Sequence, residues 1–487
     1  MKRILWIYAL LLMAAPAARG TETIIVIGDS LSKEYETEFK LLYPDHPQAW
    51  SAQNWAEILH SRRHAHFDLG DWGVFADFRL TGHRFNCAKP GGTTREFRNF
   101  LRQDQAAQDE VTASGTGLLL WPQFRGWRTV FDTLTTQADK MVIFLGGNDL
   151  ALGNSDPLAN PYDGDQPREI NYETIYDGTF GPASDPNLLR DAIRKNLKSV
   201  IQYFRVTPAG WTEPRYTGPI VLVNAPHVGA TPKVIADTGT DPDRHAVATT
   251  MIERLNAEMR AMAAEFDLGY ADIYAMTHQI RLDDTYSIGG IHFNTAPDDN
   301  CGPRSLFSGD GFHPNTPAQA KIAQIILDAF RSKYPDTAGK SPALTDREIV
   351  KDILKLELDT GFKEWLESYQ VPGPQRDPLA DSDADGLTHL MEFALAHHQP
   401  HGGQDPPLPS AVLEINGSVT SLRLDYSPRF PDNAYCALVP QRSIDMKSWT
   451  DVAPDRLTKN PDGSVTVREP WISDAPAFLR LAARVAR

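Results

Sequence analysis

The stretch Thr23-Ile-Ile-Val-Ile-Gly-Asp-Ser-Leu31, close to the N-terminus, decides the fold class. Five β-branched residues in a row before Gly28 are typical of a short strand that is buried on both faces, as strands of parallel sheets are. Ser30 follows directly after this strand. Because open parallel sheets bind ligands at the carboxyl ends of their strands, the stretch predicts an α/β fold with Ser30 at the ligand-binding edge.

Two further apolar runs of the same kind follow, Lys140-Met-Val-Ile-Phe-Leu145 and Pro219-Ile-Val-Leu-Val223. Strands that alternate with amphipathic helices predict a three-layer α/β/α sandwich around a parallel sheet. The helical patterns cover residues 188–204, 246–266 and 317–334. The segments 154–187 and 281–309 are rich in Asp, Pro, Gly and Asn, and we expect both to be long loops that wall the ligand site.

Polar motifs occur where these strands end. Gly28-Asp29-Ser30-Leu31 and Leu145-Gly-Gly-Asn148-Asp149 each follow a strand, and Asp310-Gly-Phe-His313 precedes a helix. The Asp-x-x-His spacing lets one loop supply an imidazole base and the carboxylate that orients it. Each motif alone is also compatible with an ordinary turn. Only their combination indicates a catalytic site.

The stretch Pro90-Gly91-Gly92 offers backbone N–H groups that could stabilise an oxyanion. Glycine allows a backbone N–H to point into a cavity, where it can donate to an oxyanion, and the Asn148 amide can donate in the same way. Gly91 and Gly92 are both candidates for the backbone donor.

Taken in this order, the motifs resemble the SGNH (GDSL) hydrolase family over roughly residues 23–334. The resemblance places the family's four signature residues on Ser30, Gly91, Asn148 and His313, with Asp310 as the partner of the histidine. The stretch Asn224-Ala-Pro-His-Val-Gly229 also looks like one found in GDSL lipases. The resemblance implies a serine esterase that works through an acyl-enzyme and needs no cofactor or metal for catalysis.

The substrate is less determined than the reaction. An export signal together with an appended β-module favours an extracellular polymer, so we expect an ester substrate that is an acetylated polysaccharide. A lipase or short-chain esterase acting on lipid esters is the alternative, and a non-catalytic binding protein on a hydrolase scaffold is a further one. Five tryptophans could stack on sugars, pack an acyl chain or belong to the core; they are Trp50, Trp55, Trp72, Trp121 and Trp127.

Residues 1–20 predict a signal peptide, because Lys2 and Arg3 precede an apolar run at 4–16 and small residues follow it. That run is too short to span a bilayer, and no later segment predicts a membrane span. We therefore expect the mature protein to be secreted or periplasmic. The formal net charge of −15 argues against a nucleic-acid partner.

The remaining chain predicts a hydrolase domain at 21–340, a helical linker at 341–405 and a small all-β module at 406–487. The linker resembles C-terminal regions of secreted bacterial multidomain proteins. Its acidic stretch matches the EF-hand loop, which predicts a structural calcium ion rather than a solvated acidic turn. The expected ligands are Asp381, Asp383, Asp385, Leu387 (through its carbonyl) and Glu392.

Three cysteines, Cys87, Cys301 and Cys436, allow one disulfide at most. Cys87 precedes the glycine pair and Cys301 precedes the Asp-x-x-His motif. Because export favours oxidation, we expect a Cys87–Cys301 bridge that ties two loops of the site together.

Overall fold

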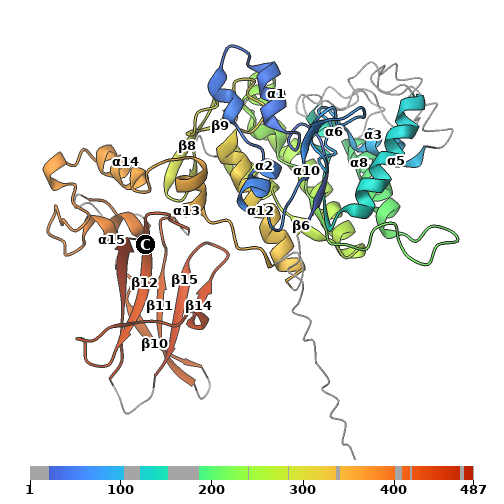
Figure 1. Ribbon diagram of the computed structural model, residues 1–487. Helices are drawn as coiled ribbons and strands as arrows, with labels where there is room; N and C mark the ends of the chain where they lie inside the picture. The colour runs from blue at the N-terminus through green and yellow to red at the C-terminus, as the bar shows by residue number, and fades with distance from the viewer. Residues whose placement is uncertain are drawn as a thin grey trace, which may run out of the picture.

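An N-terminal α/β domain, a linker of short helices and a C-terminal β-module follow one another along the chain (Figure 1). The computed structural model describes residues 21–103, 121–151, 186–239, 241–282, 285–335, 340–396, 398–400, 408–416, 419–430, 432–471 and 476–485. The expected signal peptide lies outside the described residues. So does the expected loop at 154–187, except for its last two residues, which begin α8 (Pro186–Arg205).

The central sheet has four parallel strands in the order β1-β4-β5-β6. Residues 85–89 run along the free edge of β1: Cys87 N–H donates to the Val26 carbonyl (2.9 Å) and Lys89 N–H to the Gly28 carbonyl (2.9 Å). This edge segment carries the chain toward the carboxyl end of β1. The strands are β1 (Ile24–Gly28), β4 (Lys140–Phe144), β5 (Ile220–Val223) and β6 (Gly269–Ala271).

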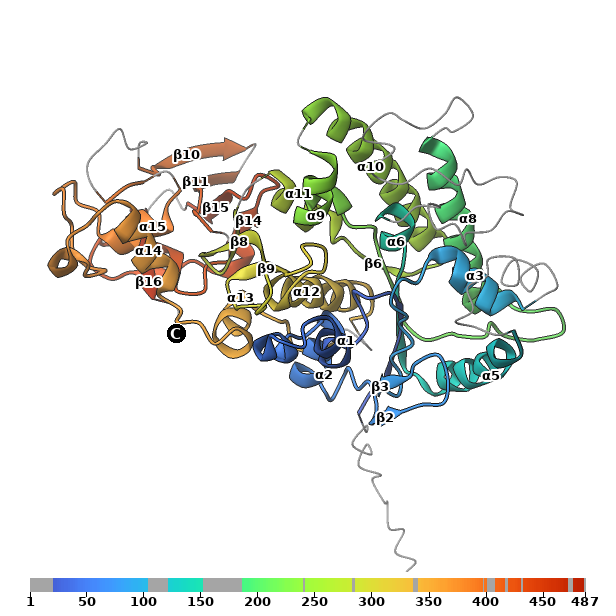
Figure 2. The same ribbon diagram turned by 90° about the horizontal axis from the view of Figure 1, so that it is seen from above.

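Alternation of side chains along the strands divides the core into two layers. Val26, Val142 and Val221 belong to one buried cluster, together with residues of α2 (Trp55–Arg62) and α12 (Thr316–Lys333). Their strand neighbours belong to a second cluster on the opposite face. That cluster is completed by α3 (Thr94–Arg102), α5 (Trp121–Gln137), α8 and α10 (Pro242–Glu265). Figure 2 shows the two helix layers on either side of the sheet, so the predicted three-layer α/β/α sandwich is confirmed.

A second, three-stranded sheet occupies the segment 281–309, which we expected to be a long loop; that expectation is wrong. The Gly289-Gly290 pair, with φ of +59° and +88°, makes the two-residue hairpin turn between its first two strands. Apolar side chains on either side of the turn, among them Ile288 and Ile291, are fully buried in the core. The strands are β7 (Thr285–Ile288), β8 (Ile291–Asp298) and β9 (Ser305–Ser308), and Asp310 comes two residues after β9.

The linker packs closely on the α/β domain. Ile349 and Val350 are fully buried in the same cluster as α12. The Arg63 guanidinium bridges both carboxylate oxygens of Glu348, at 2.8 and 2.6 Å. The linker elements are α13 (Asp346–Glu348), the π-helical turn η4 (Ile349–Ile353), α14 (Thr360–Ser368), η5 (Gly373–Gln375) and α15 (His389–Ala394).

The C-terminal module consists of two antiparallel sheets, in the orders β10-β11-β15-β14 and β13-β12-β16. It has a small core of its own, in which Leu424 and Val467 are almost fully buried. The predicted all-β module is therefore confirmed. Its strands are β10 (Ala411–Asn416), β11 (Val419–Tyr426), β12 (Cys436–Ser443), β13 (Thr450–Asp451), β14 (Leu457–Lys459), β15 (Val465–Pro470) and β16 (Phe478–Val485).

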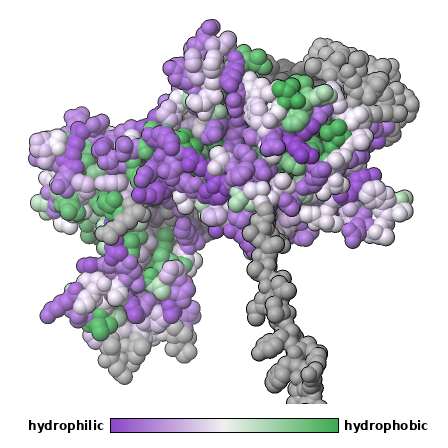
Figure 3. Space-filling view, viewed as in Figure 1, coloured by the Kyte–Doolittle hydropathy of each residue, from purple (hydrophilic) through white to green (hydrophobic). Residues whose placement is uncertain are grey.

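The α/β domain also contains shorter elements outside the central sheet. They are α1 (Tyr35–Leu42), η1 (Pro47–Ser51), β2 (Trp72–Val74), β3 (Thr81–His83), α6 (Gly147–Ala151), η2 (Val228–Ala230), α9 (Pro232–Thr238) and α11 (Tyr274–Leu282). Within the described residues, no helix is both long and apolar enough to cross a membrane. The face in Figure 3 is mostly polar, with hydrophobic side chains in small scattered groups.

The cysteines do not pair: all three thiols are free, and the predicted Cys87–Cys301 disulfide is wrong. Pairing of residues 85–89 with β1 buries Cys87 in the core layer beside α3. Cys301 instead packs against the aromatic side chains of α1 in a separate cluster. Both residues precede loops of the site, as the sequence indicated, but their side chains belong to different cores.

Candidate active site

The turn after β1 holds Ser30 at the carboxyl end of the sheet. Asp29 is fully buried and its Oδ1 accepts a hydrogen bond from Leu31 N–H at 2.9 Å, while its carbonyl accepts from Ser32 N–H at 3.1 Å. A Cβ at Gly28 would lie 2.6 Å from the Ser32 hydroxyl, so the turn requires glycine there. The Ser30 side chain therefore has a fixed position, in a residue that is only 6% exposed.

Ser30, His313 and Asp310 form a continuous hydrogen-bonded chain. His313 Nε2 lies 2.9 Å from Ser30 Oγ, and His313 Nδ1 lies 2.5 Å from Asp310 Oδ2. The other carboxylate oxygen of Asp310 accepts the backbone N–H groups of Phe312 (2.8 Å) and His313 (2.9 Å). Sequence positions 283 residues apart thus meet with the geometry of a nucleophile, a base and an orienting carboxylate.

Electrostatics couple Asp310 to His313. Burial by itself would raise the pKa of Asp310, but hydrogen bonds and charge from His313, with the backbone N–H groups, outweigh it and hold that pKa well below its usual range. Burial by itself would lower the pKa of His313, but the hydrogen bond and negative charge of Asp310 outweigh it and raise the pKa. The pair therefore favours an ionised carboxylate beside a readily protonated imidazole.

Helix α1 holds the loop that carries His313. The Tyr35 hydroxyl donates to the Pro314 carbonyl at 2.9 Å, and the Tyr43 hydroxyl accepts from Asp310 N–H at 3.0 Å. Neither tyrosine was identified from the sequence. The spacing of Tyr35, Phe39 and Tyr43 at i, i+4 and i+8 predicts a one-sided aromatic face, and that signal could have found them.

The glycine pair and Asn148 also lie together. Gly92 N–H is taken up by the Lys89 carbonyl (2.9 Å), and the Asn148 side-chain N–H donates to the Gly92 carbonyl (3.2 Å). Gly91 has a φ of +70°, and a Cβ there would meet no atom within 4 Å. Since the Gly92 N–H is engaged, Gly91 is the better placed of the two glycines to donate to a ligand.

Asp149 clamps this region together. One of its carboxylate oxygens accepts Thr94 N–H at 2.9 Å, and the other accepts the Thr94 hydroxyl at 2.6 Å. Burial raises the pKa of Asp149, although the two bonds from Thr94 oppose that shift. The clamp joins the start of α6 to the start of α3 and so fixes Asn148 relative to Gly91. The sequence contained Asp149 within a motif but gave no indication of this partner.

An apolar pocket opens beside Ser30 and Asn148. Its cavity volume is about 50 Å³, and its mouth is open to solvent. Its walls come from η2, α11, the loop after β9 and α12. The apolar lining residues are Leu31, Pro226, Val228, Ala230, Ile273, Met276, Ile280, Phe307, Phe312, Pro314, Ala318 and Ile322. The space beside Ser30 is therefore bounded mainly by apolar side chains.

The four tryptophans of this set whose side chains the structure describes do not line this pocket. Trp55 is fully buried in the core and Trp127 packs against the core. Trp50 and Trp72 are partly exposed, at 38% and 40%; Trp50 donates to the Tyr43 carbonyl and Trp72 packs edge-on against His83. The side chain of Trp121 lies outside the described residues.

The acidic loop gathers three of its five expected ligands. Oxygens of Asp381, Asp383 and Asp385 lie within 4.8 Å of one another. Gly386 has a φ of +94°, and its N–H donates to Asp381 Oδ2 at 3.0 Å, which closes the turn. The Leu387 N–H donates a hydrogen bond to Asp385 Oδ1 at 2.7 Å. Glu392 is buried in α15 and, among the described residues, does not belong to this group.

Comparison with known proteins identifies the α/β domain. The model of the family described as "GDSL-like Lipase/Acylhydrolase" matches residues 24–326. Similar solved structures include an extracellular lipase from Streptomyces rimosus (12% identity, 64% of this chain and 100% of that chain, TM-score 0.34). They also include a variant of an acetyl-xylooligosaccharide esterase from Geobacillus Stearmophilus (13% identity, 64% and 94%, TM-score 0.31). No curated protein matches the chain.

Proposed function

Because this chain belongs to the GDSL-like lipase/acylhydrolase family and is therefore an ester-bond hydrolase, we propose that it cleaves carboxylic esters through an acyl-enzyme on Ser30. The observation that carries the proposal is the contact of 2.9 Å between His313 Nε2 and Ser30 Oγ. A serine hydroxyl is a weak nucleophile until a base removes its proton, and His313 is in position to do so.

The reaction runs in two halves. Ser30 Oγ attacks the ester carbonyl while His313 takes its proton, and the ionised Asp310 stabilises the imidazolium that forms. His313 then gives the proton to the departing alcohol oxygen, which leaves the acyl group on Ser30. Water, deprotonated by the same histidine, attacks the acyl-enzyme and releases the carboxylic acid. The residues needed for each step belong to the chain itself.

The tetrahedral oxyanion needs donors. The backbone N–H groups of Ser30 and Gly91 and the side-chain amide of Asn148 are the proposed set. The Asn148 amide carries two N–H bonds, and only one of them is used by Gly92. Each such donor typically contributes on the order of 10²–10³ in rate.

The apolar pocket supports an ester with a hydrocarbon acyl chain, which was the alternative substrate class in the sequence analysis. An acetyl group would leave most of the apolar wall around Met276 and Ile280 uncovered. Deacetylation of a polysaccharide is the competing candidate. A binding protein without activity has little support, because Ser30, His313 and Asp310 keep the hydrogen bonds that catalysis needs.

Three further proposals concern the rest of the chain. Residues 1–20 are proposed to be a signal peptide that directs the protein to a secreted or periplasmic location. The loop from Asp381 to Glu392 is proposed to hold a structural calcium ion, separate from catalysis. The domain boundaries are proposed to lie near residues 340 and 405. Residues 344–354 of the linker nevertheless pack into the core of the α/β domain.

The test compares p-nitrophenyl esters from acetyl to dodecanoyl with acetylated xylan. We expect kcat/KM to rise at least tenfold from acetyl to medium-length chains, and little acetate to be released from xylan. Met276→Trp, which fills the pocket, should suppress hydrolysis of the longer esters and retain that of the acetyl ester. A preference for acetyl esters that Met276→Trp leaves unchanged would overturn the acyl-chain assignment and favour deacetylation.

A further inference from the structure

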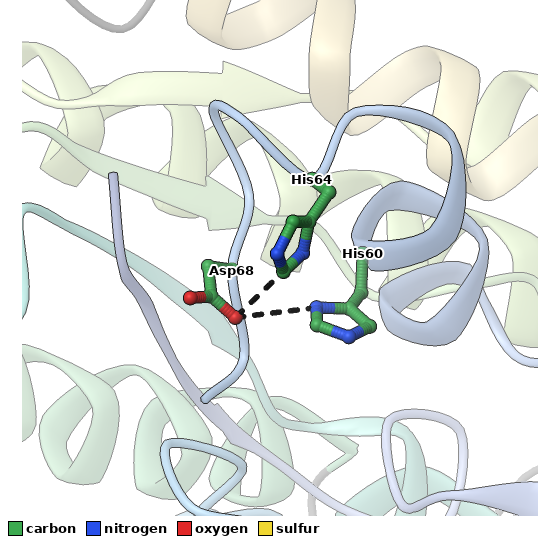
Figure 4. Close-up of side chains that lie close together, drawn as sticks. All are labelled: His60, His64 and Asp68. Carbon is green, nitrogen blue, oxygen red and sulfur yellow. Dashed lines mark ion pairs between the residues drawn. The ribbon is translucent and has the colours of Figure 1, made fainter. Parts of the chain in front are cut away.

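His60, His64 and Asp68 converge on one point at the edge of the α/β domain (Figure 4). His60 Nδ1 lies 3.5 Å and His64 Nδ1 lies 3.8 Å from the same carboxylate oxygen, Asp68 Oδ1. One ring nitrogen of each histidine and one carboxylate oxygen of Asp68 all lie within 4.8 Å of one another. These separations are too long for good hydrogen bonds. The three groups therefore face one another across a gap.

The local fold explains why the three residues meet. His60 is in the last turn of α2, and His64 lies in the turn that follows the helix, with its ring 4.8 Å from the ring of His60. Asp68 is fixed from both sides, because its N–H donates to the Glu22 carbonyl (2.9 Å) and its carbonyl accepts from Ile24 N–H (3.0 Å). The carboxylate is thus presented to the two imidazoles by the backbone that enters the sheet.

We propose that His60, His64 and Asp68 form a binding site for a divalent transition-metal ion of the zinc type. Zinc takes imidazole nitrogens and carboxylate oxygens at about 2.0–2.2 Å in a tetrahedron, which places neighbouring ligand atoms roughly 3.3–3.6 Å apart. The two measured separations, 3.5 and 3.8 Å, need to change by only a few tenths of an ångström. Two imidazoles with one carboxylate are also the donor types that such ions prefer.

Existing contacts leave room for this ion. Asp68 Oδ1 accepts Gly70 N–H at 2.8 Å and keeps a second lone pair for a metal. Leu69 N–H donates to His60 Nδ1 at 3.1 Å, and this one hydrogen bond would be exchanged for the bond to the ion. The His64 side chain is 56% exposed, which gives the ion access from solvent and leaves its fourth position to water.

The site is structural rather than catalytic. Asp68 pairs with the beginning of β1, whereas Ser30 follows its end. Five strand residues at roughly 3.3 Å each separate the two ends, so an ion there lies well away from the ester. Bound metal would tie the end of α2 to the segment that enters the sheet, and would stabilise the domain without changing the chemistry at Ser30.

The test uses full-length protein without a polyhistidine tag, stripped of metal and kept in excess calcium so that the acidic loop is saturated. Zinc binding is measured by calorimetry and by the melting temperature. We expect about one zinc ion per chain, a higher melting temperature, and unchanged kcat. His64→Ala removes an exposed ligand and should weaken binding at least tenfold. Asp68→Asn preserves an acceptor for Gly70 N–H and should do the same.

His46→Ala is the matched control, because His46 is another partly exposed histidine, paired with Asn300 and Asp299 on a different element. It should bind zinc as the unmodified protein does. Absence of zinc binding, or binding that His64→Ala and Asp68→Asn leave intact, would overturn the proposal. A fall in kcat on zinc removal would overturn its structural role.

Discussion

The hydroxyl oxygen of Tyr43 accepts a hydrogen bond of 3.0 Å from the backbone N–H of Asp310. Tyr43 is the C-cap residue that follows α1, and α1 begins five residues after Ser30. The helix next to the proposed nucleophile therefore holds the loop that carries its base. Residues that are far apart in the sequence therefore hold the same site in place. The contribution of each can be measured.

Tyr43→Phe should lower kcat by roughly two- to tenfold with little change in KM. It removes one hydrogen bond, worth about 0.5–1.5 kcal/mol, and leaves the ring packed against Phe39. Steady-state kinetics on a soluble ester tests this. Tyr369→Phe, in the linker, is the control and should be neutral. An unchanged kcat for Tyr43→Phe would show that Asp310 is positioned without it.

Ser30→Ala and His313→Ala should each lower kcat by on the order of 10³-fold or more, because the members of such a triad act as a unit. Circular dichroism should show that both variants remain folded. Both substitutions remove side chains at the edge of the sheet and leave its apolar core unchanged. If Ser30→Ala retained a tenth of the original kcat, Ser30 would not be the nucleophile.

The activity should fall as the pH falls through the pKa of His313. The base must be neutral, and the interaction with Asp310 raises this pKa above its ordinary value of 6.5. The inflection in kcat/KM therefore lies above pH 6.5, with higher activity on its alkaline side. Asp310→Asn removes the negative charge and should move the inflection to lower pH. A profile for the unmodified enzyme with its inflection below 6.5 would contradict the coupling.

Chelation of calcium should destabilise the linker and the tail while ester turnover barely changes. The carboxylates of Asp381, Asp383 and Asp385 lie close together, and a cation relieves their repulsion. Burial and the charges of its two neighbours raise the pKa of Asp383, which is consistent with that repulsion. Limited proteolysis near Asp377, with calcium and with excess chelator, measures the effect. Identical cleavage in both conditions would contradict the proposal that this loop binds calcium.

The sequence predicted those parts that depend on local pattern. Strand β1 and the Asp310-His313 spacing are local signals, and both are found where they were expected. The β7–β9 sheet was missed because its mixed polar composition resembles a loop, although the Gly289-Gly290 pair is a hairpin signal. The Cys87–Cys301 pairing failed because proximity of two loops does not determine which core each side chain enters.

Contacts between distant segments outside the recognised motifs could not be predicted. The clamp of Asp149 on Thr94 and the bond from Tyr43 depend on how helices pack, which no single stretch encodes. The same is true of the linker: Ile349 is simply apolar in sequence, and only the packed structure assigns it to the core beneath α12.

That shared core affects how the chain becomes an enzyme as it is synthesised. The cluster around Val26 also contains Ile349 and Ala434, and His313 is made 283 residues after Ser30. At about 5–20 residues per second, roughly 15–60 s pass between the synthesis of Ser30, the proposed nucleophile, and that of His313, its proposed base. During this interval α12, which packs in the same core as β1 and α2, has not yet been made. The hydrogen-bonded chain from Ser30 to Asp310 therefore cannot form until residue 313 has been made.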